Sequence, residues 1–304
     1  MSTTPATQIQ PSHHSLILGF FYAALAAALW SLITPFSREL FDCGVDPLAT
    51  AFWRPLLGGL CFAVYAAATR CLRVPFRDGL IMFVTGGLVG ALMFGSFQVS
   101  IDKSGGATAV VLLYTAPAWV AILSRILFHE GISRTKLAAI VIALLGVILV
   151  SLSGGSHSQS FSTLGIVCGL AAGFGYAAYF PYTFWFVRKY RVQTIYTYAF
   201  LGSAAFLLPF SWPLHTAYSV SVWAQLVGMS VFTNFLAYIA LGLSLKRISQ
   251  VQSAVIGNIE PVLGTFWVWL LFDENFSAAG WVGCAFIMLA VFLLTLEKGA
   301  RSTQ

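Results

Sequence analysis

Arg54 and Glu260 are charged residues that lie within long apolar stretches of the sequence. A charge in an apolar environment is costly, and such residues commonly carry function. Arg54 could balance a substrate carboxylate or form a gating ion pair, or it could reach outward or pair with Asp46 near the start of its own helix. Glu260 could bind a substrate ammonium group or a coupling proton, or it could stay protonated and hydrogen-bond a carbonyl freed by Pro261.

Neutral polar and aromatic residues in the same stretches could bind a substrate without reacting with it. Aromatic rings stack on apolar or aromatic groups, and amides orient amino and carboxylate groups. Asn234 and Tyr238 are four residues apart, as are Phe94 and Gln98, so each pair shares one face of a helix. The predicted substrate-binding residues are Trp30, Phe94, Gln98, Tyr114, Tyr179, Asn234, Tyr238 and Asn258.

The sequence contains no arrangement of residues typical of catalysis. All five His fall in predicted loops or tails, and no metalloprotease, nucleophile-elbow or phosphate-loop motif occurs. The five Cys show no metal-ligand spacing and no disulfide framework. We therefore expect no enzyme activity, no metal site and no cofactor.

The composition indicates that helices in a membrane position the candidate residues. Of the 304 residues, 59% are hydrophobic and only 9% are charged, whereas soluble domains have about 25% charged residues. The apolar runs are continuous rather than alternating, which excludes a barrel and indicates spanning helices of about 20 residues. The predicted fold is an all-α polytopic membrane protein with ten spans, at 17–40, 48–70, 79–101, 105–128, 134–152, 162–187, 193–211, 219–245, 250–272 and 277–297.

The basic residues predict how the chain threads through the membrane, because Lys and Arg gather in cytoplasmic loops. With a cytoplasmic N-terminus, the 16 Lys and Arg all fall on the cytoplasmic side except Arg38, Lys103 and the intramembrane Arg54. Both termini are then cytoplasmic, and the membrane is the inner or plasma membrane. The bases are spread in small groups over short loops, so their excess does not indicate nucleic-acid binding.

The sequence contains an internal repeat at an offset of 144 residues. Pro117 and Glu130 are 13 residues apart, and Pro261 and Glu274 repeat that spacing. This predicts two five-helix halves, 1–152 and 153–304, and the odd number of helices inserts the second half in the opposite orientation. Inverted repeats are typical of secondary transporters, whose substrate sites lie near the membrane midplane. The predicted hinges are the prolines within the spans, Pro35, Pro117, Pro181 and Pro261.

The repeat also relates candidate site residues to one another. It aligns Asn258 with Tyr114 and Glu260 with Ala116. Asn258 and Glu260 are two residues apart, which separates their side chains by about 200° on a regular helix. The two are therefore not expected to face the same point, and Asn258 is the preferred lining residue.

Several motifs resemble a known family. They are Ala-Leu-Trp30-Ser31, the run from Asp46-Pro47 to Trp53-Arg54, Tyr114-Thr-Ala-Pro117 and Glu260-Pro261. In this order, and with the duplication, they resemble the EamA-type transporters of the drug/metabolite transporter superfamily over nearly the whole chain, and among them most closely the YddG-type aromatic amino-acid exporters. The family often has Gly before the Glu that ends the fourth and ninth spans, where this sequence has His129 and Asp273.

The resemblance implies ten helices in two inverted halves around a central substrate cavity, and export of amino acids or related metabolites. The expected function is secondary transport of neutral, aromatic or otherwise zwitterionic amino acids by alternating access. A channel-like facilitator, an exporter of drugs or other metabolites and an intramembrane lipid enzyme are the alternatives. The expected partners are the small-molecule substrate and the lipid bilayer, and the oligomeric state stays open, with a monomer as one option.

Overall fold

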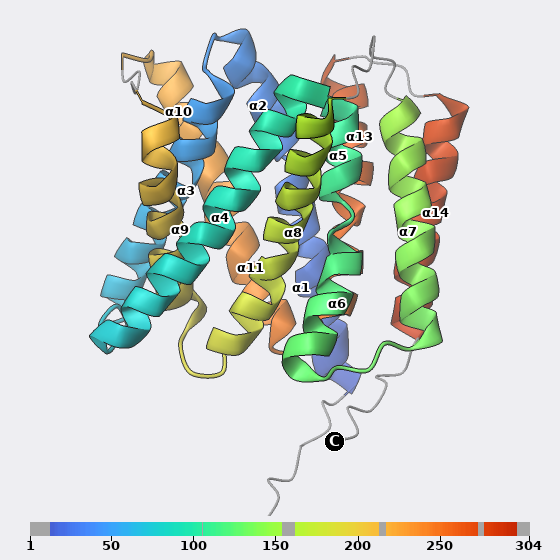
Figure 1. Cartoon of the computed structure of the whole chain (residues 1–304), viewed down its shortest axis with the longest axis horizontal. Helices are drawn as coiled ribbons and strands as arrows, with labels where there is room; N and C mark the ends of the chain where they lie inside the picture. The colour runs from blue at the N-terminus through green and yellow to red at the C-terminus, as the bar shows by residue number, and fades with distance from the viewer. Residues whose placement is uncertain (1–12, 105, 154–161, 213–216, 273–276, 297–304) are drawn as a thin grey trace, which may run out of the picture.

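The computed structural model describes residues 13–104, 106–153, 162–212, 217–272 and 277–296, and these ranges contain helices and no strand. The helices stand side by side and run between two ends of the molecule (Figure 1). In chain order they are α1 His13–Ser31, α2 Ile33–Asp42, α3 Pro47–Ala68, α4 Phe76–Ser104, α5 Gly106–Leu113, α6 Ala116–Phe128, α7 Arg134–Ser153, α8 Thr163–Phe186, α9 Val192–Leu207, η1 Leu208–Phe210, α10 Val220–Met229, η2 Ser230–Leu236, α11 Ala237–Leu245, α12 Gln250–Gly257, α13 Ile259–Phe272 and α14 Ala278–Leu296.

Six helical stretches are long and apolar enough to cross a membrane. They are Ser15–Asp42, Pro47–Ala68, Phe76–Ile101, Ala109–Phe128, Thr163–Phe186 and Val220–Leu245. The other predicted spans are also helical, in α7, α9, α12 with α13, and α14, and their crossing of the membrane stays a prediction.

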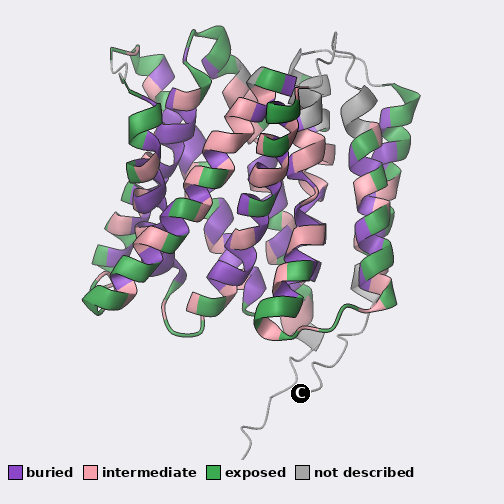
Figure 2. Cartoon of the chain, viewed as in Figure 1, coloured by how far each residue is buried: buried purple, intermediate pink, exposed green. Residues whose placement is uncertain are grey.

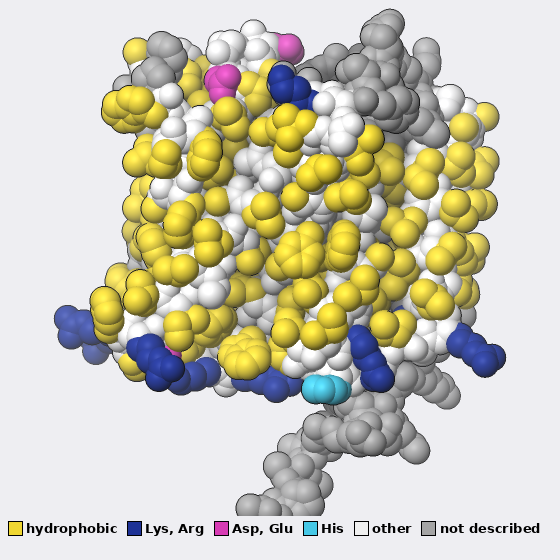
Figure 3. Space-filling view, viewed as in Figure 1, with side chains coloured by type: hydrophobic (Ala, Val, Ile, Leu, Met, Phe, Trp, Pro, Cys, Tyr) yellow, Lys and Arg dark blue, Asp and Glu magenta, His cyan; other side chains and the backbone are white. Residues whose placement is uncertain are grey.

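The outer surface of the helix bundle is apolar between its two ends (Figure 3). Large apolar side chains such as Val64 and Ile126 are 70% and 65% exposed. Lys and Arg lie mainly at the end where α6 and α8 finish, here called the basic end, and acidic residues appear at the opposite end (Figure 3). An apolar belt between charged ends is the surface of a protein that has lipid as its solvent. The protein is an integral membrane protein.

Three helical stretches are broken close to a proline. The breaks fall at Leu32 between α1 and α2, at Tyr114 and Thr115 between α5 and α6, and at Asn258 between α12 and α13. Proline lacks an N–H and its ring clashes with the carbonyl four residues earlier, which interrupts the helix. Hydroxyl groups next to the first two breaks donate hydrogen bonds to backbone carbonyls of the preceding turn. Ser31 Oγ donates to Ala28 O at 2.7 Å, and Thr115 Oγ1 donates to Leu112 O at 2.6 Å.

The predicted hinge prolines differ in their local structure. Pro35, Pro117 and Pro261 lie two to three residues after the three breaks, in α2, α6 and α13. Pro181 lies inside α8, which continues through it as a helix. A hinge role stays a prediction for all four, but the local interruption that a hinge needs accompanies only the first three.

The stretch from α10 to α11 contains a π-helical segment, η2, and the three elements follow one another without a break. A π-turn is wider than an α-turn, is rare, and often occurs at functional positions. Asn234 and Thr233 are buried in this segment. The apolar run predicts a regular helix here, and no residue in Ser230–Leu236 signals the wider turn.

Helices α4, α8, α9, α3 and α11 form the closely packed part of the bundle, whose facing sides are buried (Figure 2). Close approach depends on glycine at one crossing: a Cβ on Gly90 of α4 would overlap the side chains of Ser203 and Tyr179. Helices α7 and α14 pack mainly on each other and stand at one side (Figure 1). The polar and aromatic candidate residues lie in the closely packed part and in the broken helices beside it.

Candidate functional site

Arg54 is buried in α3 and is held by residues from two other helices. Its Nε donates a hydrogen bond to Asn234 Oδ1 of η2 at 3.2 Å, and its guanidinium lies over the Phe94 ring of α4, 5.2 Å from the centroid. Thr233 Oγ1 donates to the same Asn234 oxygen at 3.2 Å. We call Arg54, Phe94, Thr233 and Asn234 the Arg54 group.

The alternative pairing of Arg54 with Asp46 is wrong. Asp46 caps the start of α3, where its Oδ1 accepts hydrogen bonds from Leu48 N at 2.7 Å and Ala49 N at 3.2 Å. Arg54 points instead toward a helix 180 residues later in the chain. Its partner amide has a free donor, because Asn234 Nδ2 is buried and has no hydrogen-bond partner.

Aromatic rings from four helices meet at Tyr238 of α11. Its ring centroid lies 5.3 Å from Trp30, 5.6 Å from Tyr179, 4.8 Å from Tyr196 and 4.8 Å from Phe200. All four contacts are edge-to-face, the geometry that the ring quadrupole favours. We call these five residues the aromatic group.

Glu260 lies in the first turn of α13, directly after the break at Asn258. Its carboxyl group lies near the hydroxyl of Tyr114, which is at the equivalent break between α5 and α6. Tyr176 of α8 lies beside Glu260 and close to the end of α12. It interacts electrostatically with Glu260, and a Cβ atom added to Gly257 would lie 3.5 Å from the Tyr176 hydroxyl. We call Tyr114, Tyr176, Asn258 and Glu260 the Glu260 group.

The expectation that Asn258 and Glu260 face different points rested on a regular helix, and that premise is wrong. Helix α12 ends at Gly257 and α13 begins at Ile259, so the angle of a continuous helix does not apply between them. Asn258 is 1% exposed, and its Nδ2 has no hydrogen-bond partner. The hydroxyl of Tyr176 is likewise buried and unpartnered.

The three groups are joined by packing and by electrostatics. Trp30 contacts Tyr238 of the aromatic group and also Tyr176 of the Glu260 group, whose ring centroid is 5.7 Å away. Arg54 and Glu260 influence each other electrostatically, but in the described part of the chain no ion pair joins them. The arrangement therefore keeps Arg54 and Glu260 out of direct contact, and Trp30 connects the aromatic group to the Glu260 group by ring contacts.

Two of the predicted substrate-binding residues stand apart from this pattern. Gln98 is half-buried in α4 with an unpartnered Oε1, and no hydrogen bond found among the described residues joins it to the others. Tyr179 contributes its ring to the aromatic group, but its hydroxyl lies 3.3 Å from Ser203 Oγ and 3.5 Å from Gly86 O. That hydroxyl connects α8 to α9 and α4.

Tyr196, Phe200 and Thr233 belong to these groups but were not among the predicted site residues, whereas the sequence favoured Tyr176 together with Tyr179 as lining a cavity. Tyr196 and Phe200 are four residues apart on α9, so the spacing rule that found Asn234 with Tyr238 could have found them. Tyr176 lies three residues before Tyr179, in the aromatic stripe of α8. Thr233 has no comparable signal, because its contact is with the side chain of the next residue, Asn234, and follows no helical spacing.

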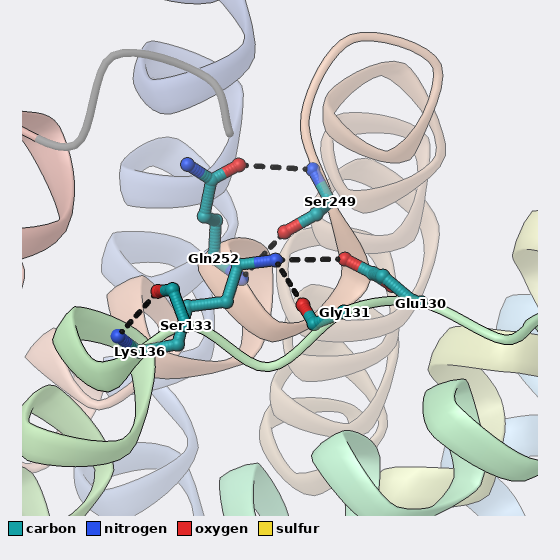
Figure 4. Close-up of polar contacts among 6 residues, drawn as sticks. All are labelled: Glu130, Gly131, Ser133, Lys136, Ser249 and Gln252. Carbon is teal, nitrogen blue, oxygen red and sulfur yellow. Dashed lines mark hydrogen bonds and ion pairs between the residues drawn. The ribbon is translucent and has the colours of Figure 1, made fainter. Parts of the chain in front are cut away.

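At the basic end, the connection between α6 and α7 is fixed by a mostly buried ion pair (Figure 4). Lys136 Nζ donates to Glu130 Oε1 at 3.1 Å and to Gly131 O at 3.3 Å. Helix α12 packs against α6 and α7 and begins with a capping box of Ser249 and Gln252, also drawn in Figure 4. Glu130 therefore has a structural partner.

The residue before Glu130 has the conformation that glycine prefers. His129 ends α6 in the left-handed region, with φ 56°. Glycine adopts a positive φ without steric strain, so glycine suits this position, whereas the backbone of His129 is strained there. Asp273, at the equivalent position of the second half, lies outside the described residues.

Comparison with known proteins agrees with the helical membrane architecture. The model of the EamA-like transporter family matches residues 17–152 and 163–296. Uncharacterized transporter YdfC of Bacillus subtilis is 25% identical over 86% of this chain and 82% of its own length. Uncharacterized inner membrane transporter YicL of Salmonella typhimurium is 27% identical, over 74% of this chain and 76% of its own length.

The comparison also found a relative whose name gives its substrate and, separately, a solved structure of similar fold. Pseudopaline exporter CntI of Pseudomonas aeruginosa is 23% identical over 92% of this chain and 96% of its own length. A solved crystal structure superposes with a TM-score of 0.76 at 20% identity and covers 93% of this chain and 96% of that one, which shows a shared fold. Because the family model covers nearly all of the sequence and the relatives are transporters rather than enzymes, the chain belongs to the EamA-like transporter family.

Proposed function

We propose that the protein is a secondary transporter that exports neutral amino acids, aromatic ones among them, and related metabolites by alternating access. The observation that carries this proposal is the pair of helix breaks at Tyr114 and Asn258, which are 144 residues apart and adjoin the half-buried carboxyl group of Glu260. Broken helices at the midplane are the usual binding elements of secondary transporters, because they free backbone and side-chain polar groups inside the membrane.

Alternating access would use two inverted five-helix halves, 1–152 and 153–304. The two segments matched by the family model, 17–152 and 163–296, support this division. Ten crossings with both termini in the cytoplasm follow from the distribution of Lys and Arg. The breaks near Pro35, Pro117 and Pro261 would absorb the change in direction between the two states.

The substrate would be a zwitterion with an apolar or aromatic part. Glu260 would take the amino end, while Arg54 and the free Nδ2 of Asn234 would orient the carboxylate. Rings of the aromatic group would stack on the apolar part. Near-equal numbers of positive and negative groups favour a substrate without net charge. The name of the relative pseudopaline exporter CntI supports export as the direction.

The test is substrate counterflow in proteoliposomes that contain the purified protein. Vesicles preloaded with unlabelled amino acid should accumulate labelled amino acid transiently, and the rate should saturate, because a carrier has a limited number of sites. Uptake that rises without saturation would identify a channel-like facilitator. A panel of neutral, acidic, basic and non-amino-acid solutes ranks the substrates, and counterflow confined to other metabolites would contradict the amino-acid assignment.

Coupling to protons would involve Glu260, the carboxyl group at the break. A pH step alone, without a substrate gradient, should drive labelled substrate across the vesicle membrane if a proton is coupled. The Glu260→Gln protein should lose that response even where it still exchanges substrate, because glutamine binds no proton. Movement that ignores the pH step would show transport down the substrate gradient alone.

A further inference from the structure

The basic end of the bundle contains a pocket outside the candidate transport site. Its volume is about 450 Å³, and it is lined by Phe184, Val187, Arg188, Leu245 and Lys246. These residues come from the ends of α8 and α11, which pack against each other. The pocket thus combines three apolar side chains with two cations.

The two cations of this pocket are not neutralised by nearby acids. Arg188 and Lys246 are exposed, and among the described residues neither has a carboxylate partner. Acidic residues at this end of the bundle are engaged elsewhere: Glu130 pairs with Lys136 and Asp78 pairs with Lys189. The hydrogen bond with Asp78 raises the pKa of Lys189, which keeps that pair charged.

Aromatic residues place the pocket at the depth of lipid headgroups. The Arg188 guanidinium lies 4.5 Å from the centroid of the Phe184 ring, and Phe184 in turn contacts Phe128 at 5.0 Å. Trp185, next in the chain, is 61% exposed on the outer surface. Exposed Trp beside Lys and Arg is typical of the boundary between the acyl chains and the headgroups.

We propose that this pocket binds an anionic phospholipid. The phosphate group would be held by Arg188 and Lys246, and the upper part of the acyl chains would lie on Phe184, Val187 and Leu245. Basic pockets between membrane helices on the cytoplasmic side are suited to anionic headgroups, and the leaflet there is rich in them. The charge of the pocket and its apolar wall together favour a lipid over a soluble anion.

The experiment measures lipid binding to the full-length protein by native mass spectrometry in detergent, with phosphatidylglycerol as the probe and phosphatidylcholine as the comparison lipid. Wild-type protein should retain phosphatidylglycerol preferentially. Each of Arg188→Gln and Lys246→Gln should weaken that binding about fivefold, and the double variant about 25-fold, because a basic residue near the membrane surface contributes about that factor. The Arg73→Gln/Arg134→Gln double variant is the matched control, since it removes two exposed cations outside the pocket.

The control variant should bind phosphatidylglycerol within about twofold of wild type, since surface charges outside a contact are largely screened. Equal weakening in both double variants would overturn the pocket and leave only a general attraction. Equal retention of phosphatidylcholine would overturn the role of charge. Competition by glycerol phosphate as strong as competition by the lipid would overturn the lipid assignment in favour of a soluble phosphate. The melting temperature in lipid-free detergent verifies that the variants are folded.

Discussion

The Arg54 group and the Glu260 group place opposite charges in the same helix bundle, but the two charged side chains have different kinds of partner. The Arg54 guanidinium has an amide acceptor at 3.2 Å and an aromatic face at 5.2 Å. The Glu260 group adjoins two helix breaks and includes two buried polar atoms without partners, Asn258 Nδ2 and the Tyr176 hydroxyl, whereas the Arg54 group includes one, Asn234 Nδ2. Since buried polar groups are normally paired, the unfilled capacity indicates where a ligand would bind.

This difference suggests a division of labour between the groups. The Arg54 group connects α3, α4 and η2 and would hold the carboxylate of the substrate in a fixed place, through the guanidinium and the free Nδ2 of Asn234. The Glu260 group would make and break hydrogen bonds with each transport cycle. Substitutions that remove one kind of interaction from one group distinguish these roles.

The largest effect is expected for Glu260→Gln. The substitution keeps a polar side chain near Tyr114 but removes the negative charge, so substrate counterflow should fall about 10–100-fold while folding is retained, as for loss of a charged hydrogen bond. Initial rates in proteoliposomes provide the measurement. The exposed Glu39→Gln is the control and should transport at the wild-type rate. Wild-type transport by Glu260→Gln would reverse the comparison.

The second effect is expected in stability rather than in transport. Arg54→Lys keeps the positive charge but loses the hydrogen bond from Nε and the flat contact with Phe94, which should destabilise the protein by about 2 kcal/mol. Thermal melting in detergent measures this change. Because the charge remains, the KM for counterflow should stay within about threefold of wild type. A KM increase larger than that of Glu260→Gln would show that substrate binding depends more on the geometry of the Arg54 group than on the charge of Glu260. Arg73→Lys, which alters an exposed residue, is the control.

A smaller effect is expected for the neutral polar atoms of the Glu260 group. Asn258→Ala and Tyr176→Phe each remove one unpartnered polar group, so neither should reduce the melting temperature. Each should raise the KM about fivefold if the lost group contacts substrate, as for a neutral hydrogen bond of about 1 kcal/mol. Thr85→Ala, an exposed polar change on α4, is the control. An unchanged KM in both variants would remove these two residues from the binding site.

The smallest effect lies outside both groups. His129→Gly should stabilise the protein by about 0.5 kcal/mol, because glycine adopts a positive φ without strain and this gain slightly exceeds the entropy that glycine loses on folding. Thermal melting measures it, and transport should not change. Ile132→Gly in the following loop is the comparison and should not stabilise, since Ile132 does not have a positive φ. Loss of stability in His129→Gly would show that the His129 side chain contributes more than its backbone strain costs.

Much of the helical architecture could be predicted from the sequence, because the signals are local. Continuous apolar runs located the helices, and Pro35, Pro117 and Pro261 located the three breaks to within three residues. Pro181 shows the limit of that rule, because α8 continues through it. Whether proline breaks a helix depends on the neighbours that satisfy the freed carbonyl, and those are not local in sequence.

The candidate site was predictable in its residue types but not in its pairings. Intramembrane charge singled out Arg54 and Glu260, and helical spacing singled out Tyr238 and Asn234. The partner of Arg54 lies 180 residues away, so no local rule could choose Asn234 over Asp46. The Glu260 group lies at a break between α12 and α13, and a calculation that assumes a regular helix does not apply there.

The π-helical segment η2 has a consequence for how the sequence can change its length. Between Ser230 and Leu236 the helix accommodates more residues per turn than an α-helix does. An α-helix turns by about 100° per residue, so a wider turn takes up one extra residue while the helix after it keeps nearly the same orientation. Deletion of one residue there would restore an ordinary helix and leave Tyr238 facing Trp30. The same deletion in the α-helical stretch Ala237–Leu245 would rotate every later residue of that helix by about 100°. The π-helical segment is therefore a place where the chain can lose one residue without changing the face that α11 presents.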